Sequence, residues 1–109
     1  MIEIVYKRKK HLVTMNGHAG SGQAGRDIVC AAATMLLYTL ASNVTNLCDS
    51  KPRLYRRKHI RLTEGYGEVS CAPIRDAKTV GTLVFDTVCA GFELLSRQYP
   101  ENVSYKMIN

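Results

Sequence analysis

The sequence predicts an α+β domain in which two helices pack on one face of a mixed or antiparallel β-sheet. Two kinds of apolar pattern support this class. Short alternating stretches are typical of strands, and two longer stretches with apolar residues three and four positions apart are typical of helices. Their order along the chain is ββαββαβ. The 109 residues fit one domain, 1–109, and the 46% hydrophobic content is that of a globular protein.

The N-terminal part predicts a hairpin followed by a loop. Residues 2–7 and 12–16 alternate between apolar and polar side chains, and the basic turn between them lacks the usual glycine. The next ten residues, 17–26, are small and rich in glycine, which predicts a mobile loop that opens for a ligand and closes over it. Its glycines are Gly17, Gly20, Gly22 and Gly25.

The first helix is expected to begin at Asp27, whose side chain suits an N-cap, and to end before Pro52. Its apolar face is expected to comprise Val29, Ala33, Leu37, Leu40, Val44 and Leu47. A second hairpin then spans residues 54–71, with its turn near Glu64–Gly67.

Asp76 is expected to cap the second helix, which Pro100 ends, and residues 103–108 form a last strand. The expected buried stripe of this helix comprises Val80, Leu83, Val84, Thr87, Val88, Gly91, Leu94 and Leu95.

Composition restricts the compartment and the partners. The longest apolar stretch, 28–41, is too short to cross a bilayer, and no signal peptide is visible, so we expect a cytoplasmic protein without membrane contact. A net charge of +6 favours either an RNA or DNA contact or simply a solvated basic surface.

Cys48, Cys71 and Cys89 are expected to be buried packing residues. Because no C-x-x-C pair or zinc-finger histidine spacing occurs, neither a metal nor another cofactor is expected.

Cys30 and His18 are the candidate catalytic pair. If the helix begins at Asp27, Cys30 lies in its first turn, where free backbone N–H groups and the helix dipole favour a thiolate and an oxyanion. His18 lies twelve residues earlier, and the intervening loop can bring its imidazole to the thiol as a general base. Asp27 and Thr34 share a helix face with Cys30, so they are candidate supporting residues.

The segment Gly17-His18-Ala19-Gly20, followed by Gly25 and Asp27-Ile28-Val29-Cys30-Ala31-Ala32, resembles the signature of the ribosomal-processing cysteine protease family Prp. The resemblance covers essentially the whole chain. It implies an α+β homodimer that removes the N-terminal extension of bacterial large-subunit ribosomal protein number twenty-seven during ribosome assembly. It also implies that Cys30 is the nucleophile and His18 the general base. Thr34 stands where many members have serine.

Two other functions are compatible with the residues. A ribosome- or rRNA-associated binding module without catalysis would use the basic surface, and a thiol redox sensor would need a second cysteine close to Cys30.

Overall fold

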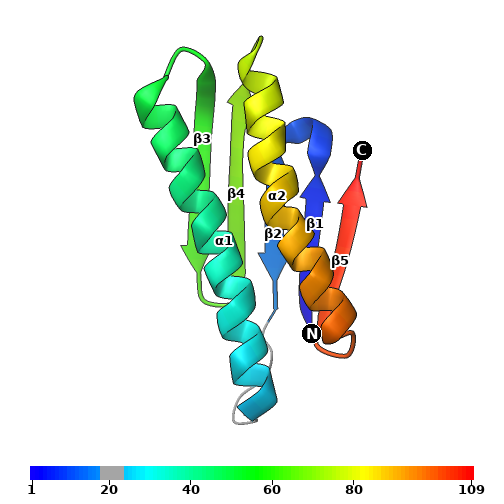
Figure 1. Cartoon of the computed structure of the whole chain (residues 1–109). Coiled ribbons are helices and arrows are strands. Elements are labelled where there is room, and N and C mark those ends of the chain that lie inside the picture. The colour runs from blue at the N-terminus through cyan, green and yellow to red at the C-terminus, as the bar shows by residue number, and fades with distance from the viewer. Residues whose placement is uncertain (18–23) are drawn as a thin grey trace.

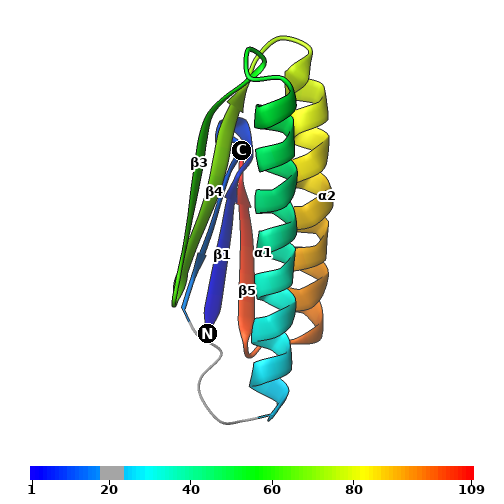
Figure 2. The same ribbon diagram turned by 90° about the vertical axis from the view of Figure 1, so that its left-hand side faces the viewer.

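A computed structural model describes the backbone of residues 1–17 and 24–109, and the side chains of residues 1–17 and 28–109. One five-stranded sheet carries two long helices on a single face (Figures 1 and 2). The elements are β1 (Ile2–Lys7), the short 3-10 helix η1 (Arg8–Lys10), β2 (Leu12–Asn16), α1 (Ala24–Ser50), β3 (Tyr55–Thr63), β4 (Tyr66–Pro73), α2 (Ala77–Gln98) and β5 (Val103–Ile108). The predicted class and element order are confirmed.

The sheet has the strand order β3-β4-β2-β1-β5 and is mixed. Both hairpins are antiparallel, β2 pairs antiparallel with β4, and β5 pairs parallel with β1. Strands β3 and β5 are therefore the two edges, and a register shift between Arg56 and His59 makes a β-bulge in β3. Because β2 and β4 are neighbours, the end of β2 lies beside the β3–β4 turn, and this arrangement positions the candidate site.

The first hairpin turns without glycine because His11 adopts the left-handed conformation that a glycine would supply. Its φ is 47°, and its backbone N–H donates to the carbonyl of Arg8 at 3.1 Å, which closes η1. The His11 ring is also buried, and its Nε2 lies 2.8 Å from Oγ1 of Thr82 on α2. These contacts fix the turn against the helix layer.

The apolar face of α1 is largely the predicted one. Val29, Ala33, Leu37, Leu40 and Val44 are buried against the sheet, and Leu47 is partly buried. Burial of such side chains stabilises the fold by about 1.5–3 kcal/mol each.

The predicted buried stripe of α2 is confirmed at Val88 and in part at Val84, Gly91 and Leu95, which are partly buried, and it is wrong at Val80, Leu83, Thr87 and Leu94. The buried residues of this helix are Ala77, Gly81, Phe85, Val88, Cys89 and Phe92. Val80, Leu83 and Leu94 are exposed instead. The helix is apolar on several sides, and the sheet takes the side that carries two phenylalanines, whose burial removes the largest apolar area from water. Gly81 allows close packing there, since an added Cβ would lie 3.0 Å from the Pro73 ring.

Both helices, over Ile28–Ser50 and Ala77–Gln98, are long and apolar enough to cross a bilayer by length and composition. Each of them also packs one face against the sheet, which is the arrangement of core helices (Figure 2).

Candidate active site

A groove of 420 Å³ lies between α1, the end of β2 and the β3–β4 turn. Helix α1 contributes Cys30, Thr34, Leu37 and Tyr38 to its wall. The facing wall comprises Met15, Gly17 and residues 62–67. The groove therefore combines a thiol, a hydroxyl and apolar surface.

Helix periodicity brings Cys30 and Thr34 together, as predicted. They are one turn apart on α1, both are half-buried, and both line the groove. The buried side chains of Val29 and Ala33 anchor the same helical turns to the sheet. The thiol is thus held on a rigid element rather than on a loop.

The predicted start of the helix is wrong, because α1 begins at Ala24 rather than after an Asp27 cap. Ala24 and Arg26 are good helix formers and extend the helix backwards. Cys30 is therefore the seventh residue of α1, beyond the four N-terminal residues whose N–H groups lack a helical partner. The expectation that first-turn amides at Cys30 activate the thiol and hold an oxyanion is not supported by this position. The side chain of Asp27 lies outside the described residues.

The predicted loop, residues 17–26, includes a part that the structure does not describe and a part that belongs to α1. His18, Gly20 and Gly22 lie outside the described residues, so the catalytic pairing of His18 stays a prediction. Gly25 belongs to α1, which contradicts its assignment to the loop.

Gly17 is the last described residue before His18, and it lines the groove. Its N–H donates to the carbonyl of Gly65 at 2.9 Å, and its φ is 104°. The residue directly before His18 is therefore held at the groove wall. An added Cβ at Gly17 would collide with the carbonyl oxygen of Met1, so a glycine is needed at this point.

Sequence reasoning missed the apolar part of the groove. On the α1 wall, Tyr38 is 49% exposed. On the facing wall, Leu62 is 39% exposed, and Tyr66 at the start of β4 also lines the groove. The Tyr66 hydroxyl donates to Oε2 of Glu68 at 3.0 Å, and burial together with this carboxylate raises the pKa of Tyr66. Tyr38 could have been found from the i, i+4, i+8 series that begins at Cys30. The turn residues come from a distant part of the chain and gave no local signal.

The other cysteines pack in the core, as predicted. Cys48, Cys71 and Cys89 are all buried, and burial raises the pKa of Cys71 to about 11 and that of Cys89 to about 12. None of them lines the groove. Cys48 lies eighteen residues beyond Cys30 on the same helix, about 27 Å away at 1.5 Å per residue. Among the described residues, a redox sensor centred on Cys30 therefore lacks a second thiol.

A half-buried thiol in a groove, with a hydroxyl one turn away, is compatible with a hydrolase that uses a cysteine nucleophile, a mechanism that also requires a general base beside the thiol. The family model described as "Cysteine protease Prp" matches residues 1–104. The chain therefore belongs to the Prp family of cysteine proteases.

Individual relatives agree with this assignment. The ribosomal processing cysteine protease Prp of Staphylococcus aureus is 25% identical over 91 residues, which cover 84% of this chain and 80% of the relative. The crystal structure of SMU.848 from Streptococcus mutans is similar, with 27% identity, a TM-score of 0.63 and coverage of 98% of this chain and 91% of that chain. A Staphylococcus aureus Prp structure with a covalently linked product peptide shares the fold, with a TM-score of 0.66, 22% identity and coverage of 98% and 97%.

Proposed function

We propose that this chain is an endopeptidase that removes the N-terminal extension of bacterial large-subunit ribosomal protein number twenty-seven during ribosome assembly. Membership of the Prp family supports the reaction class. The observation that carries the proposal is the position of Cys30 in the wall of an open groove. The curated relative is named a ribosomal processing protease, and a structural neighbour holds a covalently linked product peptide.

The proposed chemistry uses a dyad of Cys30 and His18. His18 takes the thiol proton, and the thiolate attacks the scissile carbonyl to form a tetrahedral intermediate. Collapse of this intermediate breaks the C–N bond, and the imidazolium gives its proton to the departing amine. Water then hydrolyses the thioester with His18 as general base, which releases the acid product and restores the thiol. Asp27 and Thr34 are the proposed supporting residues, acting on the imidazole and on the thiol or substrate.

The groove favours an extended peptide with apolar or aromatic side chains. Tyr38, Leu62 and Tyr66 expose apolar area on its two walls, and the buried side chain of Leu37 lies beneath them. Such surface gains free energy when a substrate side chain displaces water from it. This composition supports a substrate whose cleavage site follows an aromatic-rich segment.

The test is a cleavage assay on a peptide that spans the extension of the ribosomal protein from the same organism, with products identified by mass spectrometry. We expect one bond to be cleaved by the wild type and no cleavage by Cys30→Ala or His18→Ala. Cys48→Ala is the matched control, because it removes a thiol outside the groove and should retain activity. Turnover by a folded Cys30→Ala variant would refute the mechanism.

We further infer a cytoplasmic homodimer. Exposed apolar side chains on the outer face of both helices support self-association: Ile28 is 65% exposed, Met35 and Leu83 are each 64% exposed, and Leu94 is 56% exposed. Sedimentation equilibrium is expected to give twice the monomer mass. A monomer mass at every concentration would refute the dimer.

The second candidate function is a non-catalytic ribosome- or rRNA-associated binding module. The observation that favours it is the clustering of basic side chains away from the groove. Its distinguishing result is ribosome association that survives Cys30→Ala, together with no peptide cleavage by the folded wild type.

A further inference from the structure

Positive charge is concentrated at one end of the molecule. We define the basic end as residues 7–10, 49–58 and 75–78, which lie toward one end of the molecule (Figure 1). There the turn after α1 leads into β3 beside the segment before α2, and η1 packs against α2 and β4. The basic end includes eleven of the fifteen lysines and arginines but only two of the nine carboxylates, Asp49 and Asp76. The molecule is 45 Å long, so this segregation makes it electrostatically polar along its length.

The cations of the basic end are available to a partner. Among the described residues, Arg8 is the only one of them in an ion pair, at 3.0 Å from Asp86. Nine of the other ten are exposed: Lys9, Lys10, Lys51, Arg53, Arg56, Arg57, Lys58, Arg75 and Lys78. Their charge is therefore not neutralised within the fold.

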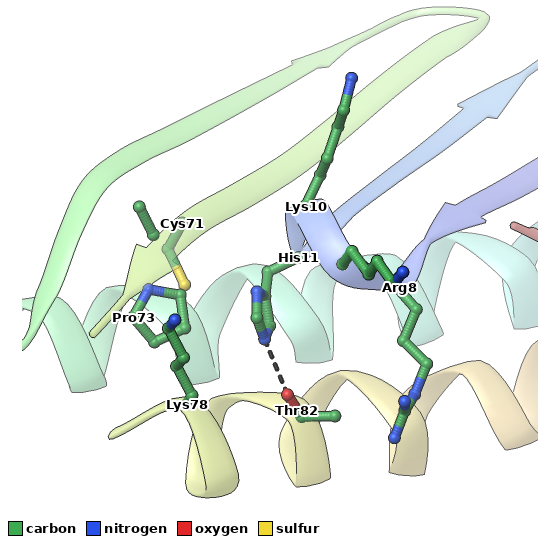
Figure 3. A pocket seen from close by; sticks show the side chains of 9 residues that line it. Arg8, Lys10, His11, Cys71, Pro73, Lys78 and Thr82 are labelled. Atoms are coloured by element: carbon green, nitrogen blue, oxygen red, sulfur yellow. Dashed lines mark hydrogen bonds between the residues drawn. The ribbon is translucent and has the colours of Figure 1, made fainter. Parts of the chain in front are cut away.

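A pocket of 520 Å³ opens at this end between η1, the end of β4 and the first turns of α2 (Figure 3). Arg8, Lys9, Lys10, His11 and Lys78 line it, and no carboxylate does. Burial first, and then the charges of Lys78 and Arg8, lower the pKa of His11, while Asp86 acts in the opposite direction. The cations that line the pocket therefore oppose a further positive charge there. Such a pocket suits a phosphate group.

Backbone conformation at this end is also unusual. Arg57 and Arg75 have φ values of 54° and 53°, in the left-handed region that favours glycine. Arg57 lies in the β-bulge of β3, and bulges redirect side chains at the edge of a sheet. Arginine therefore occupies two positions at each of which the backbone conformation costs a residue other than glycine about 1–2 kcal/mol.

We propose that the basic end binds the phosphate backbone of structured RNA, with one phosphate in the pocket between η1 and α2. The choice of RNA among nucleic acids rests on the proposed function, because a protease that processes a ribosomal protein acts beside RNA. Within the basic end no large hydrophobic residue is exposed; Ile108, which lines a pocket with Lys7, Lys9 and Lys10, and Val80 border it, so it offers fewer apolar anchors than the continuous apolar face of a lipid-binding helix.

The position of the basic end leaves the groove free. No residue of the basic end lines the groove, and at the end of α1, where the basic end begins, Ser50 lies twenty residues beyond Cys30, about 30 Å along the helix. RNA and a substrate peptide can therefore bind at the same time.

The test measures fluorescence anisotropy of an RNA hairpin of about twenty base pairs, titrated with the full chain carrying Cys30→Ala, so that binding is observed without turnover. We compare Lys10→Gln/Lys78→Gln with Arg97→Gln/Lys106→Gln. The first pair removes two charges from the pocket, and the second removes two charges outside the basic end. Circular dichroism checks that both variants fold.

We expect the pocket variant to bind RNA about tenfold more weakly at about 100 mM salt, and the control variant within about twofold of its parent. The slope of log affinity against log salt is negative, and it should become less negative by about one to two for the pocket variant. The reason is that a complex with fewer phosphate contacts releases fewer counterions when it forms. Equal loss in both variants, or an affinity that does not change between about 50 and 200 mM salt, would overturn the proposal. Binding to phosphatidylglycerol vesicles without binding to the hairpin would overturn it as well.

Discussion

Leu37 and Leu40 allow the groove to be tested separately from the core. Both lie on α1 and are essentially fully buried, with 1% and 0% of their surface exposed. Leu37 also forms part of the groove, where its Cδ2 contacts Gly67, whereas Leu40 does not line it. We therefore expect Leu37→Ala and Leu40→Ala to have the same effect on stability and different effects on catalysis.

The expected loss of stability follows from burial. Truncation of a fully buried leucine costs about 3 kcal/mol, within a range of roughly 2–5 kcal/mol. At about 4–8 °C per kcal/mol for a domain near this size, a loss of about 3 kcal/mol should lower the melting temperature of each variant by about 12–24 °C. Urea denaturation measures the first quantity and thermal circular dichroism the second.

The catalytic effect should be confined to Leu37. Leu37 supports the groove from beneath, against Gly67, so its truncation should shift the wall on which the substrate is positioned. Because small displacements of a bound substrate are costly, we expect kcat/KM for the extension peptide to fall about tenfold in Leu37→Ala. Leu40→Ala should stay within about twofold when assayed well below its melting temperature. Equal kcat/KM in the two variants would refute the assignment of this groove as the substrate site.

Three further predictions concern the groove and the η1 turn. Thr34→Val removes a hydroxyl at nearly constant volume and should lower kcat about tenfold, whereas Thr34→Ser should retain activity; equal kcat values for the two variants would exclude a role for the hydroxyl. Gly17→Ala should destabilise the fold by about 1–3 kcal/mol in urea, because φ is 104° and the new Cβ meets the Met1 carbonyl; an unchanged midpoint would contradict this. Burial lowers the pKa of His11, so its contribution to stability is present above about pH 6.5 and is lost as pH falls below it. His11→Asn, which tolerates a left-handed φ, should therefore lose less stability than the wild type between pH values of about 7.5 and 5.

The hairpins and the face of α1 could be predicted because their signals are local. Alternation marks β1, β2 and β4, and the predicted series of α1 at spacings of three and four is the one that packs on the sheet, although Ile28 and Met35 on the same helix are apolar and exposed. Helix α2 has apolar residues on several sides, so periodicity alone could not decide between the stripe through Leu83 and the stripe through Phe85. The bulk of Phe85 and Phe92, and the close approach to Pro73 that Gly81 allows, decide it in three dimensions.

The candidate site likewise has one part that the sequence predicts from local spacing and one part that only the three-dimensional pairing of strands determines. Cys30 and Thr34 are one turn apart, so helix geometry predicts that they meet. The facing wall depends on the pairing of β2 with β4, which brings Gly17 within hydrogen-bond distance of Gly65, forty-eight residues later. No local pattern contains that information. The sequence predicts the wrong start for α1 because aspartate is a favoured N-cap residue, whereas the residues from Ala24 to Asp27 are already helical.

The charged edge strand has a consequence for self-association. Strand β3 leaves one side of its backbone unpaired, and an unpaired edge is a template on which a strand of another molecule can add. Arg56, Arg57, Lys58 and Arg61 lie along that strand, and its bulge interrupts the regular spacing of backbone donors and acceptors. Two copies brought edge to edge would place these like charges against each other, so polymerisation into continuous sheets is disfavoured. A stable pair of copies must therefore assemble through another surface, and replacing these cations with neutral residues is expected to make the protein prone to aggregation.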